Sequence, residues 1–232
     1  MNKFTLLTDN TRNTKFLKGI KYGYACYGLS LAPAKLSGYN VCPMATNGCK
    51  FSCINTSGKG IFQNVQDARI KRTKWFFENR TDFLKNLSFD IQIAIIEAAR
   101  KNLIPTFRLN TFSDLPFENY DIIEQYPTVQ FFDYTKIFRR LLPESKASKL
   151  KNYHLTFSAS ENNISHVKLA LQMKKNVAVV FKNELPKTYL GKKVVNGDIH
   201  DLRFLDPKNI VVGLTAKGRA KYDESGFVVD NA

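Results

Sequence analysis

The sequence lacks the long apolar runs of a membrane protein and the leader of a secreted one. No stretch approaches the ~18 consecutive apolar residues that a membrane-spanning helix needs, and the first residues carry no apolar signal core. Cysteine is scarce, with four in 232 residues, and three of them are clustered, unlike a secreted disulfide framework. We therefore expect a cytoplasmic protein that does not enter a membrane.

Acidic residues are also in short supply. Lys and Arg number 35 against 20 Asp and Glu, which gives a formal net charge of +15 and a pI near 9.6. This surplus favours a polyanionic partner, and we expect nucleic acid, with DNA ahead of RNA, because the basic residues form no amphipathic membrane anchor. A bias towards lysine codons in an AT-rich genome would explain the same surplus of basic residues without any partner.

Three thiols lie close together in the stretch CPMATNGCKFSC, which contains Cys42, Cys49 and Cys53. Thiolates this close repel one another and oxidise unless a cation binds them, and three cannot all pair as disulfides. We predict that they bind zinc or a [4Fe–4S] cluster, although C-x6-C-x3-C matches neither a zinc-finger knuckle nor a common ferredoxin pattern. A redox role, or simple packing of buried thiols, would also place cysteines here. Cys26 is a candidate fourth ligand.

The apolar segments predict an α/β fold. We predict a first strand within residues 21–33, leading into the cysteine-bearing loop, and two long helices at 61–79 and 82–101. Helix-like segments at 117–126, 134–149 and 163–175 then separate five short strand candidates, at 106–110, 129–133, 154–158, 177–181 and 210–214. Such β–α repeats build parallel sheets. We predict an irregular lead-in over residues 1–20 and one domain over 21–232. The domain is expected to be a parallel barrel or an open doubly wound sheet, and among barrels we prefer a partial or small (β/α) barrel to a full eight-stranded one.

Polar residues of catalytic type follow each strand candidate. In a barrel the carboxyl ends of the strands form one rim, so these side chains would converge on a pocket beside the cysteine loop. The predicted catalytic residues are Asn110, Asp114, Asp133, Lys136, Glu161 and Lys217, and the predicted cofactor-binding residues are Ser158, Lys182 and Thr215. Strand ends also collect polar residues simply because they run into solvent or begin helices.

A second constellation lies in the segment NGDIHDLRF. Asp198 and Asp201 flank His200, and such a trio binds divalent ions or performs acid–base chemistry. The preceding Asn-Gly pair is equally typical of a surface turn. The segment from Gly213 to Gly218 lacks the spacing of a Walker loop, which disfavours a nucleotide triphosphatase.

Six motifs carry a resemblance to a known family. The segments CPMATNGCKFSC, RLNTFSD, FFDYTK, NYHLTFS, GDIHDLRF and VGLTAKG resemble the phage and plasmid family known as gene product eighty-eight, over most of residues 22–229. The resemblance implies a mobile-element origin and hence a role related to DNA or RNA. It implies no catalytic assignment.

Two further resemblances are architectural. The layout is similar to radical S-adenosylmethionine enzymes, partial barrels whose first strand runs into a three-cysteine loop that binds a [4Fe–4S] cluster with one iron open for S-adenosylmethionine. Their usual spacing is C-x3-C-x2-C, whereas this chain has C-x6-C-x3-C. It also resembles phage enzymes related to tRNA-guanine transglycosylases, in which Asp114 and Asp133 would act as nucleophile and base, but the zinc pattern of that family is absent.

These observations lead to three hypotheses of function. The first is a metal- or iron–sulfur-dependent enzyme that modifies or processes nucleic acid. The second is a non-enzymatic DNA- or RNA-binding protein, such as a replication or anti-defence factor, with a structural metal site. The third is a DNA base transglycosylase that uses the barrel aspartates.

Overall fold

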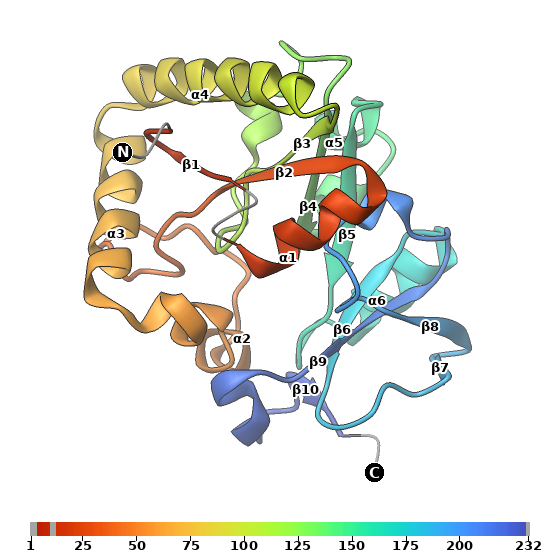
Figure 1. Ribbon diagram of the computed structural model, residues 1–232. Coiled ribbons are helices and arrows are strands. Elements are labelled where there is room, and N and C mark those ends of the chain that lie inside the picture. The colour runs from red at the N-terminus through yellow and green to blue at the C-terminus, as the bar shows by residue number, and fades with distance from the viewer. Residues whose placement is uncertain (1–3, 10–12, 231–232) are drawn as a thin grey trace.

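The computed structural model describes residues 4–9 and 13–230, and they form a mixed α/β fold around a mostly parallel sheet (Figure 1). The strands are β1 (Leu7–Thr8), β2 (Tyr24–Leu29), β3 (Ile104–Arg108), β4 (Gln130–Thr135), β5 (Tyr153–Ser158), β6 (Val177–Phe181), β7 (Thr188–Tyr189), β8 (Lys192–Asn196), β9 (Val211–Thr215) and β10 (Val228–Val229). The helices are α1 (Thr14–Leu17), α2 (Asn47–Phe51), α3 (Gln63–Glu78), α4 (Arg80–Arg100), α5 (Lys146–Lys149) and α6 (Ile164–Gln172).

The order of the strands in the sheet follows the order of the chain for most of its width. The path is β1-β2-β3-β4-β5-β6-β9-β8-β7, and every pair from β2 to β8 is parallel. Two short antiparallel strands, β1 and β7, end the path, and β10 adds a parallel pairing to β6. The five strand candidates that follow the long helices correspond to β3, β4, β5, β6 and β9. The prediction of an α/β fold with a parallel sheet is confirmed.

The long helices cover one face of this sheet. Side chains that are paired across parallel strands point to the same face, and the register aligns Tyr27, Phe107, Phe131 and Tyr153 in one row. This row packs in a single core with the buried side of α4, whereas Phe157 and Val177, on the same face, pack beneath α6. α4 and α6 thus bury their apolar sides on the same face of the sheet.

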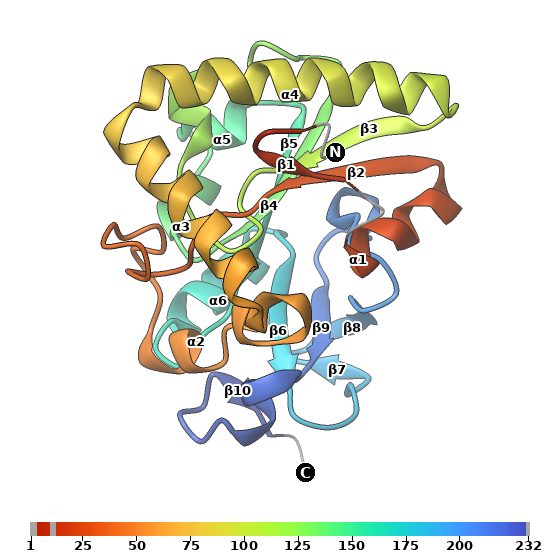
Figure 2. The same cartoon turned by 60° about the vertical axis from the view of Figure 1, so that its left-hand side comes forward.

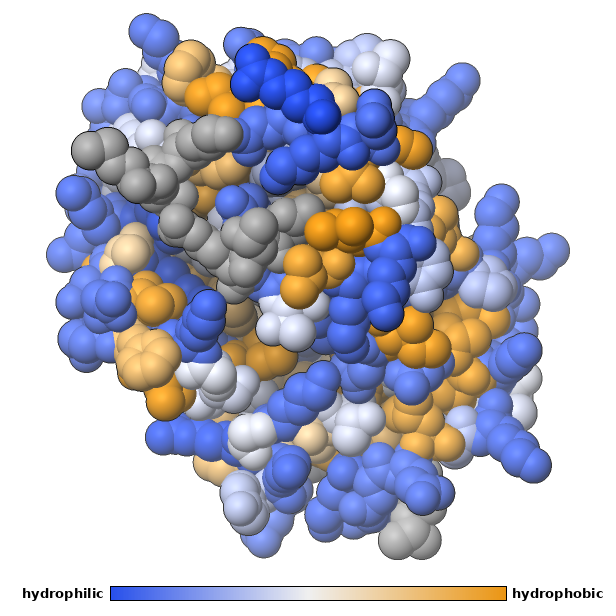
Figure 3. Space-filling view, in the orientation of Figure 1, coloured by the Kyte–Doolittle hydropathy of each residue, from blue (hydrophilic) through white to orange (hydrophobic). Residues whose placement is uncertain are grey.

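The opposite face has a different cover. Phe16 from α1 and Leu202 pack on Cys26 of β2, and Phe204 lies edge-on to Tyr24, with ring centroids 5.2 Å apart. Figure 2 shows α4 and α1 on opposite sides of β2. Figure 3 shows hydrophilic residues over most of the visible surface, with apolar residues between them in small groups. No helix of the described residues is long and apolar enough to cross a bilayer.

Two of the predicted helical segments are mostly irregular. The segment 117–126 contains only the 3-10 turn η4 (Phe117–Tyr120), which ends where Asp121 adopts a left-handed φ of 57°. The segment 134–149 contains the 3-10 turn η5 (Phe138–Leu141) and the short helix α5. Pro143 accounts for the second interruption because proline lacks the N–H that a continuing helix needs. The remaining 3-10 turns are η1 (Lys18–Tyr22), η2 (Ile54–Thr56), η3 (Gly58–Ile61), η6 (Arg203–Leu205) and η7 (Gly218–Tyr222).

Candidate functional site

The three clustered thiols lie beyond the carboxyl end of β2, the first parallel strand. Cys42 precedes α2, Cys49 lies within α2, and Cys53 immediately precedes the 3-10 turn η2. All three are free and partly exposed. Burial raises the pKa of Cys42 to about 12, and the neighbouring thiols of Cys53 and Cys49 and the carboxylate of Asp114 add to the rise. The thiols are therefore close enough to influence one another electrostatically.

Cys42 and Cys53 have different surroundings. The Cys42 thiol donates to the carbonyl of Phe112 (3.4 Å) and accepts from the N–H of Ala34 (3.4 Å). Burial also raises the pKa of Cys53, but a backbone hydrogen bond and the cations of Lys136 and Arg69 oppose the rise. A positive field at Cys53 favours its thiolate, which is the form that binds metals.

Glu161, which follows β5, holds the start of the thiol-bearing helix. Its Oε1 accepts from the N–H of Gly48 (2.8 Å) and its Oε2 from the hydroxyl of Thr46 (2.7 Å). Thr46 is in turn the N-cap of α2, because its Oγ1 accepts from the N–H of Cys49 (3.2 Å). Glu161 thus links the helix that carries Cys49 to the end of β5.

The C-terminal segment packs against the same helix. Asp223 Oδ1 accepts from the hydroxyls of Ser52 (3.3 Å) and Ser225 (2.8 Å), and its Oδ2 accepts from the N–H of Val228 (3.0 Å). A Cβ on Gly48 would lie 2.0 Å from Ser225 Oγ and 2.7 Å from the Cβ of Phe227. Only glycine allows this approach, so residues 223–228 and α2 form one close contact.

The stretch after Cys53 is fastened to α3. Asn55 accepts from the guanidinium of Arg69, and Gln66 donates to the carbonyl of Gly60. The Arg69 guanidinium also lies over the ring of Phe112, 4.0 Å from its centroid. Because Phe112 also accepts the Cys42 hydrogen bond, both ends of the thiol stretch are tied to the loop after β3.

Two of the predicted catalytic residues form a buried pair at the ends of β3 and β4. Asp133 Oδ1 accepts from the N–H of Asn110 (2.7 Å), and its Oδ2 accepts from Asn110 Nδ2 (3.1 Å) and from the Tyr153 hydroxyl (2.9 Å). Burial raises the pKa of Asp133 to about 6, while Arg108 and these hydrogen bonds oppose the rise. Asp133 is 0% exposed and lies on the face covered by helices, so its carboxylate is enclosed by these hydrogen-bond partners.

Asp114 belongs to a second buried network, centred on Arg140. The Arg140 guanidinium donates to Asp114 Oδ1 (2.8 Å), to both oxygens of Glu118 (2.8 Å each) and to the Tyr153 hydroxyl (2.7 Å). The other oxygen of Asp114 accepts from the N–H of Lys136 (2.7 Å). Asp114 also donates its own N–H to the carbonyl of Val41 (2.8 Å), beside Cys42. Asp114 therefore couples the β4 end to the thiol loop.

Lys136 and Ser158 lie together near the thiols. Lys136 Nζ donates to Ser158 Oγ (2.7 Å) and lies 5.4 Å from the centroid of the Phe227 ring. No ion pair of Lys136 is found among residues 4–9 and 13–230. The ammonium is thus a positive charge beside Cys53 that is available to an anionic or electron-rich ligand.

The other predicted residues lie elsewhere. Lys182 pairs with Asp230 at the surface (2.8 Å). Lys217 Nζ donates to Asp198 Oδ1 (2.6 Å), and the N–H of Thr215 donates to Asp198 Oδ2 (2.9 Å). The structure therefore brings Asp114, Lys136, Ser158 and Glu161 to the thiols and places Lys182, Thr215 and Lys217 in separate ion-pair groups.

The trio around His200 does not converge. Asp198 faces Lys217, as described above, whereas Asp201 pairs with Arg108 of β3 (2.8 Å). His200 Nδ1 lies 3.2 Å from Arg203 Nη2, and burial, together with the charge of Arg203, lowers the pKa of this histidine. These three side chains have different partners and form no shared site.

Sequence reasoning missed Arg108, Tyr134 and the burial of Arg203 on the face opposite the long helices. Arg203 is fully buried and pairs with Asp206 (3.3 Å). In the described part of the chain, Arg203 Nε, Asp201 Oδ1 and the Tyr134 hydroxyl are buried without a hydrogen-bond partner. The only sequence signal was the alternation of polar and apolar residues in β3 and β4, which places Arg108 and Tyr134 on this face.

Cys26 lies apart from the other thiols. It is 1% exposed, it packs on Phe16 and Leu202, and burial raises its pKa, with Asp201 adding to the rise. Within the described residues, no three His, Cys, Asp or Glu side chains form a group that could hold a metal ion. Cys26 therefore behaves as a small apolar side chain of the sheet.

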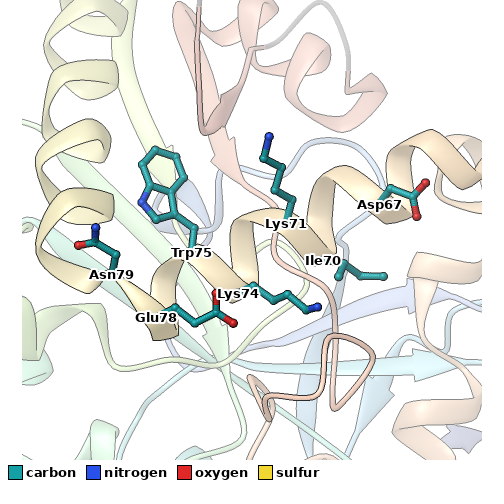
Figure 4. A pocket seen from close by; sticks show the side chains of 7 residues that line it. All are labelled: Asp67, Ile70, Lys71, Lys74, Trp75, Glu78 and Asn79. Carbon is teal, nitrogen blue, oxygen red and sulfur yellow. The ribbon is translucent and has the colours of Figure 1, made fainter.

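Two surface hollows are present near these elements. One, of about 190 Å³, is lined by Cys42 together with Asn40, Lys50 and neighbouring residues. The other, of about 480 Å³, lies along α3, where Figure 4 shows Lys71 and Trp75 on one side of the helix and Glu78 on the other. Trp75 donates its indole N–H to Asp82 (3.0 Å), so its polar edge is already occupied.

The fold and this arrangement define an α/β protein whose parallel sheet carries a thiol-bearing loop at the carboxyl edge of its strands. The chain belongs to the Gene product 88 family, whose model matches residues 5–231. No curated protein and no solved structure matches it.

Proposed function

We propose that the protein is an iron–sulfur-dependent enzyme of mobile-element origin that modifies or processes nucleic acid. The observation that supports this most is the set of three free thiols within one twelve-residue stretch, which Glu161 fastens beyond the first parallel strand. Cys42, Cys49 and Cys53 would hold the cluster. Cys26 would take no part, because it packs on the opposite side of β2.

A cluster and a single zinc ion place their thiolate ligands at different distances from one another. Around one zinc ion, sulfurs at about 2.3 Å from the metal lie about 3.8 Å from one another. In an iron–sulfur cluster each thiolate binds a different iron, so the sulfurs lie further apart. We prefer the cluster because the C-x6-C-x3-C spacing is not that of a zinc-finger knuckle, whose paired cysteines are separated by two or four residues.

The order of the strands supports a partial (β/α) barrel. From β2 to β6 each new parallel strand is added beside the previous one, with the long helices on one face, which is the winding of a barrel. On this proposal the carboxyl ends of the strands, beside the thiol-bearing loop, line the active site. A [4Fe–4S] cluster with an open iron would supply an electron to S-adenosylmethionine.

The protein's own residues would prepare this site in three ways. The cations of Lys136 and Arg69 stabilise the thiolate of Cys53 and partly balance the negative charge of a thiolate-bound cluster. Lys136 and Ser158 would bind and orient an anionic or polar ligand group. Asp114 would act as a positioning residue, because it holds the N–H of Lys136 and the carbonyl of Val41.

The test is the metal content of anaerobically purified protein. We expect brown protein with iron and acid-labile sulfide in equal amounts, and each single change Cys42→Ser, Cys49→Ser or Cys53→Ser should remove most of the iron. Cys26→Ser is the matched control and should keep it. Colourless protein with stoichiometric zinc, or iron that survives all three changes together, would contradict the proposal. Mass spectrometry of nucleosides from expressing cells tests the activity.

One observation favours the alternative of a non-enzymatic nucleic-acid-binding protein. The predicted catalytic carboxylates of Asp114, Asp133 and Glu161 all accept hydrogen bonds from other residues of the fold, which gives each a structural role. On this alternative the metal serves only to fasten the loop. Nucleosides that are unchanged in expressing cells, together with nucleic-acid binding that survives loss of iron, would favour it.

A further inference from the structure

An unusual number of large apolar side chains are exposed around the thiol loop. Phe51 is 45% exposed, Phe62 56% and Tyr222 77%, and they come from α2, from the residue after η3 and from η7. Met44, Ile54 and Ile61 are also exposed in the same stretch. Exposed apolar groups of this density mark interaction sites.

The charge of these segments has one sign. Residues 42–66 and 207–222 contain no Asp or Glu, although the chain has 20. Lys50, Lys59, Arg219 and Lys221 are all exposed. Among residues 4–9 and 13–230 none of the four takes part in an ion pair, whereas Lys217 is neutralised by Asp198.

The two segments lie side by side in the fold. η2 contacts η7, and a Cβ on Gly218 would lie 2.9 Å from the Cβ of Ser57. Ser52 is hydrogen-bonded to Asp223, immediately after η7. Figures 1 and 2 both show the turn before β10 beside the region of α2. The exposed rings and the four unpaired cations therefore belong to one region, which we call the aromatic–basic surface.

We propose that the aromatic–basic surface binds single-stranded nucleic acid and delivers it to the thiol site. Lys50 also lines the hollow beside Cys42, so the surface is continuous with the thiols. Cations track the phosphates while exposed rings stack on unpaired bases, which a duplex keeps inside its helix. The inference rests on the proposed function for its substrate class and names the form of nucleic acid that the site accepts.

The test measures binding of the full-length protein to a fluorescein-labelled DNA oligonucleotide by fluorescence anisotropy, as a single strand and as a duplex. The single strand should bind more tightly. Because stacking on one ring contributes about 1–3 kcal/mol, Tyr222→Ala and Phe62→Ala should each weaken binding by at least about fivefold. Lys59→Gln with Lys221→Gln should lower the slope of log K against log salt by about 1.4, which corresponds to two lost phosphate contacts.

The controls come from α4, which lies on the opposite side of the molecule from α2 (Figure 2). Phe89 is 60% exposed there, so Phe89→Ala removes an equally accessible ring, and Lys85→Gln removes an exposed cation. Neither should change binding. Tighter binding of the duplex, or equal losses for Phe89→Ala and Tyr222→Ala, would overturn the proposal. A dimer that Tyr222→Ala dissociates would overturn it in favour of self-association.

The outcomes also separate this inference from the proposed function. If the anaerobically purified protein contains no iron but binds single strands with the expected dependence on Tyr222, the iron–sulfur proposal is refuted and the proposed role of the aromatic–basic surface stands. Cluster-loaded protein that does not bind single strands would refute only the proposed binding role of the aromatic–basic surface. A labelled RNA of the same sequence, compared with the DNA, decides which of the two the surface prefers.

Discussion

Arg140 offers the most quantitative test of the structure. Arg140→Met keeps most of the side-chain volume and removes the guanidinium that binds Asp114, Glu118 and Tyr153. Glu118, whose side chain is 3% exposed, would lose the donors of both its oxygens. Removing one partner of a buried ion pair costs about 3–5 kcal/mol. Because two carboxylates are affected, we expect a loss of about 4 kcal/mol in the free energy of unfolding.

Urea unfolding followed by circular dichroism measures this loss. With an m-value of about 3 kcal/mol per M, the midpoint should fall by about 1.3 M. Lys146→Met is the control, since its pair with Asp121 is largely exposed and should contribute less than about 1 kcal/mol. Adding Glu118→Leu to Arg140→Met should restore part of the stability, because it removes the stranded carboxylate. A midpoint for Arg140→Met that equals that of Lys146→Met would refute the reasoning.

Three further outcomes are expected. Burial opposes ionisation of Asp198, but hydrogen bonds from an ammonium and a backbone N–H outweigh burial and lower the pKa of Asp198 to about 2. The carboxylate therefore contributes up to about 2 kcal/mol to the free energy of unfolding above pH 4, and this contribution is lost as the pH falls towards 2. Urea unfolding of Asp198→Asn should not show this pH-dependent loss. Glu161→Gln keeps one acceptor for the start of α2 and should weaken the loop by about 1–3 kcal/mol, seen as faster iron release to a chelator. Gly48→Ala, whose Cβ would meet Ser225 Oγ at 2.0 Å, should cost about 1–3 kcal/mol and expose residues 223–228 to hydrogen exchange.

Apolar periodicity was sufficient to predict the central strands and both long helices. Runs such as Val177–Phe181 are buried on both faces, and α3 and α4 are long enough for their spacing to be unambiguous. The strands at and next to the sheet edges were missed because they are short, as in β1 and β7, or rich in lysine, as in Lys192–Asn196. Such strands form because an adjacent strand pairs with them by backbone hydrogen bonds, and the local sequence pattern does not reveal this pairing.

The approximate location of several candidate residues could be predicted from the sequence, whereas their hydrogen-bond partners could not. Asp114, Lys136 and Glu161 do lie near the thiols, because the carboxyl ends of parallel strands share one edge. The role of Arg140 could not be seen, since its partners are 13–26 positions away along the chain and its segment resembles a basic helix surface. Whether a carboxylate is free or held depends on such distant partners.

The contact between α2 and residues 223–228 has a consequence for biosynthesis. Chains begin to fold while they are still being made, N-terminal parts first. The thiol loop therefore leaves the ribosome long before Ser225 and Phe227, which pack at Gly48. A nascent chain presents its cysteines openly, to oxidants as well as to carriers of inorganic sulfur and iron, until residues 223–228 have been made and can pack against α2.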